Sequence, residues 1–151
     1  MKALLNALLL LMALGSCGAA NAFCFREAAD KYGVPVALVV AISNHESSLN
    51  PRATNVQSYG TDYGLMQINS NHIPKLIKMG VIKSAEDLFK PCLNVQIGTW
   101  ILATHLAKCG YTWECIGSYN AGFRKTKRQE ERRKQYAGYI KGQYKRMGIE
   151  L

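Results

Sequence analysis

Two carboxylates, Glu46 and Asp62, are the residues whose types and spacing most clearly suggest chemistry. Glu46 follows an apolar run, residues 36–42, that leaves no polar face, so we expect it near the end of a helix that lies inside the protein. Scarce water and the negative end of a helix both favour the neutral, proton-donating form of a carboxyl group. Glu46 is therefore a candidate general acid.

Asp62 lies between Gly60 and Gly64, in a stretch that predicts tight turns facing a cleft. Most enzymes that cleave glycosidic bonds use one acid to protonate the leaving oxygen and a second carboxylate to face the positive charge on the sugar. Asp62 could be that second group and could also raise the proton affinity of Glu46. The alternative is that Asp62 only caps its own turn.

The elements that must position these carboxylates are mainly helical. Pro35 suits the first turn of the helix that carries Glu46, and Asn50 and Pro51 stop it. The irregular stretch 50–64 has room for a small hairpin. Further helices are predicted at 26–31, 74–78, 85–89, 93–107, 112–119 and 129–147. The predicted fold class is α+β, predominantly α.

The first 22 residues have the pattern of a secretory signal peptide. Lys2 precedes an apolar run too short to span a bilayer, and Ala20-Asn21-Ala22 is a cleavage pattern. Residues 23–151 would remain as one domain without a transmembrane segment, in the periplasm. In the alternative, the chain is cut before Cys17, whose context resembles a lipoprotein box, and is anchored to a membrane by lipid.

Removal of residues 1–22 leaves an even set of cysteines, which suits two disulfides in an exported protein. The set is Cys24, Cys92, Cys109 and Cys115. Of the three possible pairings we favour Cys109 with Cys115, which closes a small loop and leaves Cys24 to pin the N-terminus to Cys92. No spacing of cysteine or histidine predicts a metal site, and no cofactor is expected.

The formal net charge is +9, and nearly all the excess lies after residue 122. We expect a basic C-terminal region, about 124–151, whose helix packs one stripe against the core and exposes a basic face. The stripe comprises Tyr136, Tyr139, Ile140 and Tyr144. The basic face could bind the anionic cell wall, a membrane surface or a partner in a secretion apparatus, or be merely solvated. Export argues against nucleic acid as a partner.

Three segments resemble, in the same order, the signature motifs of the soluble lytic transglycosylase family. They are HESSLNP at 45–51, GTDYGLMQINS at 60–70 and SYNAGF at 118–123, within a resemblance that runs from about Cys24 to Arg124. The resemblance implies a lysozyme-like fold and cleavage of peptidoglycan strands between N-acetylmuramic acid (MurNAc) and N-acetylglucosamine (GlcNAc). The usual product of that family is a 1,6-anhydroMurNAc end.

Within the family, the chain is most similar to small exported members encoded with type III and type IV secretion systems, conjugation machines and pili. The features that indicate this are Cys24 with Phe25, the segment 91–94 and the segment 98–102. The resemblance therefore implies peptidoglycan as substrate and components of such an apparatus as partners.

The resemblance also implies roles at the first two motifs. Glu46 matches the catalytic position, as single acid and base, and Ser47 matches a position that contacts sugar, whereas Ser48 could cap the helix end. Gly64 matches a glycine that lets the substrate approach the backbone, and Met66 and Gln67 match residues that line subsites.

At the third motif, Tyr119 and Asn120 match substrate-binding positions, and the tyrosine hydroxyl would orient the acid or the N-acetyl group. Core packing is the alternative for Tyr119. Trp100 and Trp113 are expected in the core rather than as platforms for sugar rings.

Asp62 is a departure, because many lytic transglycosylases lack an acid there. Residues 61–64 and 67–70 resemble instead the hairpin of animal C-type lysozymes, whose aspartate assists the catalytic glutamate. Three hypotheses follow: a lytic transglycosylase that opens the wall locally for a trans-envelope machine, a muramidase that uses Glu46 and Asp62 with water, or a weakly catalytic wall-binding assembly factor.

Overall fold

The computed structural model describes residues 23–149, and both predicted cleavage sites and Cys17 lie outside this range or at its edge. One three-stranded sheet accompanies the helices of this part of the chain, so the α+β, predominantly α class is confirmed. No helix among the described residues is long and apolar enough to cross a membrane.

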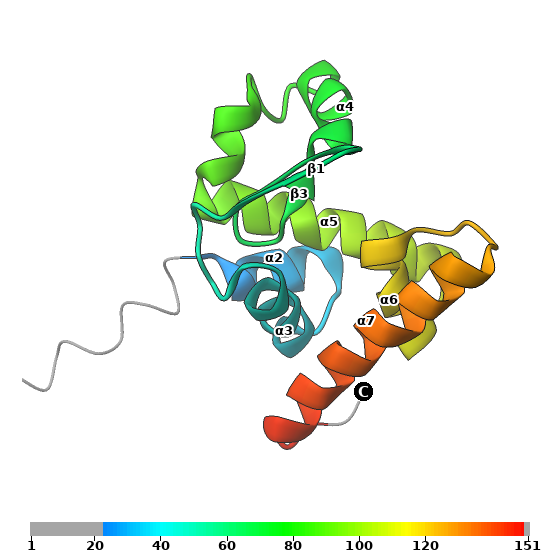
Figure 1. Cartoon of the computed structure of the whole chain (residues 1–151). Helices are drawn as coiled ribbons and strands as arrows, with labels where there is room; N and C mark the ends of the chain where they lie inside the picture. The colour runs from blue at the N-terminus through cyan, green and yellow to red at the C-terminus, as the bar shows by residue number, and fades with distance from the viewer. Residues whose placement is uncertain (1–22, 150–151) are drawn as a thin grey trace, which may run out of the picture.

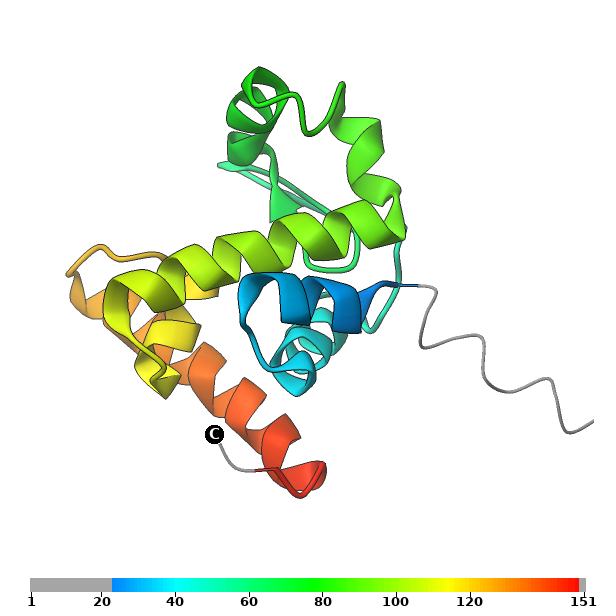
Figure 2. The same cartoon turned by 180° about the vertical axis from the view of Figure 1, so that it is seen from behind.

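The long helix α5 (Pro91–Cys109) divides the molecule into two lobes (Figures 1 and 2). On one side lie α2 (Phe25–Tyr32) and α3 (Val36–Ser47), with α6 (Trp113–Ala121) and α7 (Lys127–Arg146) beside them. On the other side lie the sheet, the 3₁₀ helix η2 (Ser70–His72), α4 (Ile73–Lys78) and the 3₁₀ helix η3 (Ala85–Phe89).

The sheet consists of β1 (Thr54–Gln57), β2 (Gly60–Tyr63) and β3 (Ile68–Asn69), paired antiparallel in that order. Gln57 pairs with Gly60, so a two-residue turn joins β1 to β2, and the hairpin predicted for this region is confirmed. The structure corrects the expectation that Asp62 could cap a turn. Asp62 lies within β2, opposite Asn55 on one side and Asn69 on the other.

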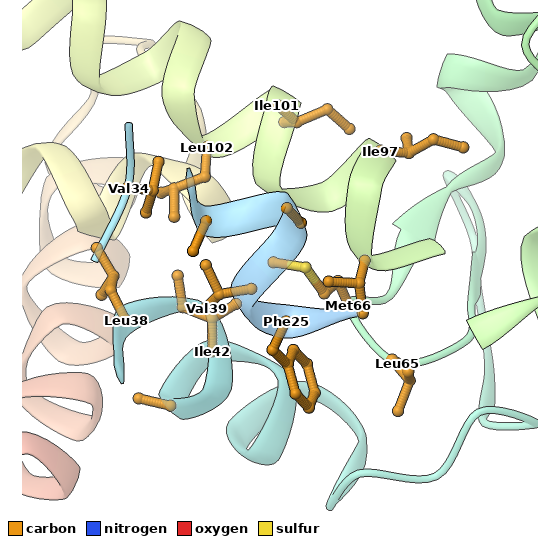
Figure 3. Packing of buried hydrophobic residues seen from close by; sticks show 14 of the residues in the cluster. Phe25, Val34, Leu38, Val39, Ile42, Leu65, Met66, Ile97, Ile101 and Leu102 are labelled. Atoms are coloured by element: carbon orange, nitrogen blue, oxygen red, sulfur yellow. The ribbon is translucent and has the colours of Figure 1, made fainter. Parts of the chain in front are cut away.

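The core forms where α2, α3 and α5 meet beneath the segment that follows β2. Figure 3 shows Val39 and Ile42 of α3, Leu102 of α5 and Met66 in one cluster, and all four are at most 1 % exposed. The apolar run of α3 packs into the core as predicted, four of its seven side chains being buried and the other three partly buried. Glu46 lies in the last turn, one residue before the helix ends. Burial of such side chains contributes about 1.5 to 3 kcal/mol each.

A buried asparagine on α5 fixes the sheet lobe to this helix. Asn94 is fully buried, and its amide oxygen accepts a hydrogen bond from the Met66 N–H at 2.8 Å. Its amide nitrogen donates to the carbonyl oxygens of Tyr63 and Leu88, each at 2.8 Å. A Cβ at Gly64, whose φ is +73°, would collide with this amide. Gly64 therefore allows packing against Asn94, a reason different from the substrate approach implied by the resemblance.

Both predicted disulfides are present, Cys24–Cys92 and Cys109–Cys115. The first ties α2 to the start of α5, and the second closes the loop before α6. Glu27 lies beside Cys24 and Cys92, a grouping of ligand types, but both sulfurs are engaged in the disulfide. They are therefore not available as thiolate ligands.

The C-terminal helix packs closely on α6, because Gly117 leaves room for the backbone of Arg133; a Cβ at residue 117 would collide with the Arg133 carbonyl oxygen. The expected basic outer face needs one correction. Arg133 is buried, and its guanidinium donates to the carbonyl oxygens of Gly122 and Arg124, both at 3.0 Å. It holds the loop between α6 and α7 instead of facing solvent.

Candidate active site

An open cavity of about 350 Å³ lies between the two lobes, and both Glu46 and Asp62 line it. Its wall on the helical side comes from α3, α5, α6 and α7, and its opposite wall comes from the sheet and η2. Two candidate carboxylates from separate segments of the sequence are therefore brought to one cleft.

Glu46 is held by a tyrosine that the sequence had predicted only as a packing residue. The Tyr136 hydroxyl on α7 donates to Glu46 Oε1 at 2.6 Å, while its ring is 4 % exposed. A buried tyrosine usually needs a partner for its hydroxyl, which is the signal that could have identified this contact from the sequence. Tyr139, predicted in the same packed stripe, is instead exposed and stacks on His45 with ring centroids 5.1 Å apart.

Burial raises the pKa of Glu46 to about 7, and the negative charge of Asp62 adds to this shift. The hydrogen bond from Tyr136 opposes it, because it favours the ionised carboxylate. The net result is a carboxyl group that can both release and accept a proton near neutral pH. That is the property expected of a residue that acts as acid and then as base.

Asp62 has the opposite surroundings, because two side-chain amides donate to its two oxygens. Gln57 Nε2 reaches Oδ2 and Asn69 Nδ2 reaches Oδ1, both at 2.7 Å. The amide of Asn69 is itself oriented by the Asn71 N–H, which donates to its oxygen at 3.0 Å, and the Tyr59 hydroxyl donates to the oxygen of Gln57. This network fixes the direction of the Asp62 carboxylate and was not predicted from the sequence.

The residues of the second motif divide between the cavity and the core. Gln67 lines the cavity, and its amide donates to the carbonyl oxygens of Gly64 and Ala53. Met66 is fully buried and does not line the cavity, nor does Gly64. Ser47 also lies outside the cavity lining, where its hydroxyl donates to the Leu65 carbonyl oxygen at 2.8 Å. In this structure Ser47 and Met66 therefore lie behind the cavity wall and do not face the cavity.

Both residues singled out in the third motif line the cavity. The Tyr119 hydroxyl donates to the carbonyl oxygen of Met66 at 2.9 Å, and burial raises its pKa well above the ordinary value. Tyr119 thus joins α6 to the loop after β2 and also faces the cleft. The amide oxygen of Asn120 accepts a hydrogen bond from Arg132 Nη2 at 3.2 Å.

Two histidines that the sequence analysis had left unassigned also line the cavity, His72 and His105. The Ser118 hydroxyl donates to the Cys115 carbonyl oxygen, so it accepts from Nδ1 of His105, 2.8 Å away. Burial lowers the pKa of both rings, which favours their neutral forms. With Nδ1 of His105 used as a donor, Nε2 is the remaining acceptor, suited to a hydroxyl group of a ligand.

The expected tryptophans lie away from this cleft. Trp100 and Trp113 are partly buried and pack against the core, as predicted, and neither lines the cavity. The cleft wall is instead polar, with amides, imidazoles and carboxylates converging on it. Such a wall fits a ligand rich in hydroxyl and amide groups, as a glycan with N-acetyl groups is.

The chain is similar to several known proteins. A family model described as a transglycosylase SLT domain matches residues 23–141. A "peptidoglycan-binding-like protein" of Escherichia coli O157:H7 is 43 % identical over 85 % of this chain and 80 % of its own length. Protein IpgF of Shigella flexneri is 39 % identical over 86 % of the chain and 84 % of its own length.

The invasion protein IagB of Salmonella typhimurium is 38 % identical, over 87 % of the chain and 81 % of its own length. Among solved structures, an inactive mutant of the lytic transglycosylase Slt from Pseudomonas aeruginosa superimposes with a TM-score of 0.65 at 19 % identity. That match covers 89 % of this chain but only 25 % of the solved chain, so it bears on the fold, which is lysozyme-like.

Proposed function

Because the chain belongs to the transglycosylase SLT family, which supports a role in cleaving glycosidic bonds, we propose that it is a peptidoglycan lytic transglycosylase. It would cleave the β-1,4 bond between MurNAc and GlcNAc and leave a 1,6-anhydroMurNAc end. The observation that carries this proposal is the carboxyl of Glu46, which has a pKa of about 7, lines the cleft and is oriented by Tyr136.

The chemistry needs one group that gives and then takes a proton. Protonated Glu46 donates its proton to the oxygen that links MurNAc to GlcNAc, the C1–O bond breaks, and positive charge develops at C1 of MurNAc. The Glu46 carboxylate then removes the proton from the C6 hydroxyl of the same sugar while O6 bonds to C1. The products are the GlcNAc hydroxyl and the anhydro ring, no water is consumed, and Glu46 ends protonated as it began.

Asp62 supports this reaction in the proposal by placing negative charge in the same cleft as the developing cation. Its network of amides favours a fixed carboxylate direction, which is the condition for electrostatic stabilisation without reorganisation. The same placement favours a second candidate, a muramidase in which water attacks C1 and leaves a reducing end.

The cellular role that we propose is local opening of the wall during assembly of a secretion, conjugation or pilus apparatus. It is supported by the similarity to IagB, which bears the name of an invasion protein, and to IpgF. We further propose export to the periplasm after removal of residues 1–22, with lipidation at Cys17 as the alternative. The intact mass of the exported protein tests both cleavage sites.

The function is tested by digesting purified peptidoglycan with residues 23–151 and identifying the soluble products by mass spectrometry. We expect anhydromuropeptides, none of them with Glu46→Gln, and normal products with Glu131→Gln, a matched change at an exposed position of α7. Reducing ends in place of anhydro ends would establish the muramidase. Intact sacculi with every variant would favour the wall-binding assembly factor.

A further inference from the structure

A second, smaller pocket opens beside the cleft and shares part of its wall. Its volume is about 190 Å³, and it is lined by His45, Asn120, Arg132, Gln135, Tyr136 and Tyr139. Asn120 and Arg132 also line the main cavity, and Tyr136 holds Glu46. The pocket is therefore a side branch of the cleft, close to the candidate acid.

The two spaces differ in charge. The main cavity contains both Glu46 and Asp62, whereas the side pocket is lined by no carboxylate and contains Arg132. Burial lowers the pKa of His45, so Arg132 supplies the standing positive charge. The ion pair found among residues 23–149 joins Lys90 to Asp87, which leaves the Arg132 guanidinium without an acidic partner in this part of the chain.

The guanidinium has a hydrogen-bond partner on α6. One of its nitrogens, Nη2, donates to Asn120, which leaves other N–H groups available at the junction of the two spaces. Arginine presents its donors in a planar fork that matches a carboxylate. The same pocket is lined by the ring of His45, which packs against Tyr136 and Tyr139 with centroids 5.1 Å away, so part of its wall is aromatic.

Because the side pocket shares Asn120 and Arg132 with the cleft, a branch of whatever occupies the cleft can reach it. The identity of this occupant rests on the proposed function: the strand in the cleft is peptidoglycan. Its branches are the peptides on the MurNAc residues, and these peptides carry carboxylates. We propose that the side pocket binds the stem peptide of the substrate, with Arg132 pairing with a peptide carboxylate. The enzyme would thus distinguish peptide-bearing strands from bare ones.

The test measures binding rather than turnover, so it does not depend on the proposed reaction. Protein with Glu46→Gln would be titrated into fluorescently labelled, solubilised strands whose amines have been acetylated. One portion of the strands retains its peptide carboxylates, and in the other portion they have been converted to amides. A third ligand consists of strands freed of peptides, which carry only the lactyl carboxylate.

We expect strands with free carboxylates to bind about tenfold more tightly than amidated ones, as for a hydrogen-bonded charge pair. Adding Arg132→Gln should abolish the difference, and Arg132→Lys should restore part of it because the charge returns without the fork. Adding Arg146→Gln, the same change at an exposed position outside both cavities, should leave the difference intact.

Three results would overturn the site: equal binding of both portions, a difference that persists with Arg132→Gln, or equal losses with Arg132→Gln and Arg146→Gln. A tenfold loss with Arg132→Gln on peptide-free strands, together with unchanged binding of peptide-bearing strands, would assign Arg132 to the lactyl carboxylate, which is free only when the peptide is absent, and overturn the peptide as ligand. Failure of the proposed function would show itself separately, as absent cleavage by the unmutated protein in the digestion experiment.

Discussion

The two walls of the cleft give their carboxyl groups different surroundings. On the helical wall, Glu46 lies at the end of an apolar helix with one hydroxyl as partner, and its pKa rises to about 7. On the sheet wall, Asp62 receives two amide donors at 2.7 Å. The first site favours a neutral carboxyl, and the second fixes the direction of its carboxylate with two hydrogen bonds. A pair of carboxylates separated in this way is suited to acid–base chemistry on one side and charge stabilisation on the other.

The largest effect is expected at Glu46, on the helical wall. Replacing it with glutamine removes the only proposed proton donor and should lower the rate of strand cleavage about 10³-fold. The rate would be followed by release of soluble muropeptides, with circular dichroism to verify folding. A loss of less than tenfold would mean that another group supplies the proton.

The same substitution, Glu46→Gln, should raise stability at alkaline pH although it lowers activity. The reason is that the folded state keeps the Glu46 proton to higher pH than the unfolded state does. Between the ordinary pKa of 4.5 and about 7 the folded protein binds more protons, so the free energy of unfolding falls as pH rises through this window. By pH 8 the free energy of unfolding is lower by about 3 kcal/mol than it would be without this shift. Glu46→Gln should recover much of that cost at pH 8 and little at pH 4, as measured by urea denaturation. Equal effects at the two pH values would contradict the assignment.

Asp62→Asn should lower both activity and stability. Loss of the negative charge should slow cleavage about tenfold, equivalent to about 1.4 kcal/mol. An asparagine also offers only one oxygen to the two amides of Gln57 and Asn69, so we expect about 1 kcal/mol less stability. Initial rates, the ratio of anhydro to reducing ends and a urea titration check these points. An unchanged rate and product ratio would reduce Asp62 to a structural residue and weaken the muramidase hypothesis.

The smallest expected effect is that of Tyr136→Phe, which removes the hydrogen bond to Glu46 and keeps the ring. Because this bond lowers the Glu46 pKa, the variant should hold its proton to higher pH. The ratio of the cleavage rates at pH 8 and pH 6 should rise two- to fivefold, equivalent to about 0.5 to 1 kcal/mol. Tyr119→Phe is the control, since that hydroxyl donates to a backbone carbonyl and should affect stability more than the pH profile.

The sequence alone predicts the main helices, the disulfides and the order of the three motifs. An uninterrupted apolar run predicts α3, apolar spacing predicts α5, and the cysteine arithmetic predicts both disulfides. Local patterns determine these features because a helix depends on neighbours three and four residues apart, and Cys109 closes a short loop with Cys115. The burial of Glu46 in the last turn of an apolar helix follows from the same local information.

Tertiary structure alone decided which distant side chains meet. Tyr136 reaches Glu46 across ninety positions of sequence, and Arg133 turns inward, although both belong to a helix whose spacing predicts only packing and a basic face. Asn94 joins α5 to the loop after β2, and in this loop Met66 is buried away from the cleft whereas Gln67 lines it. Such contacts depend on the directions of whole helices, set by close approaches such as that at Gly117, and no local spacing encodes them.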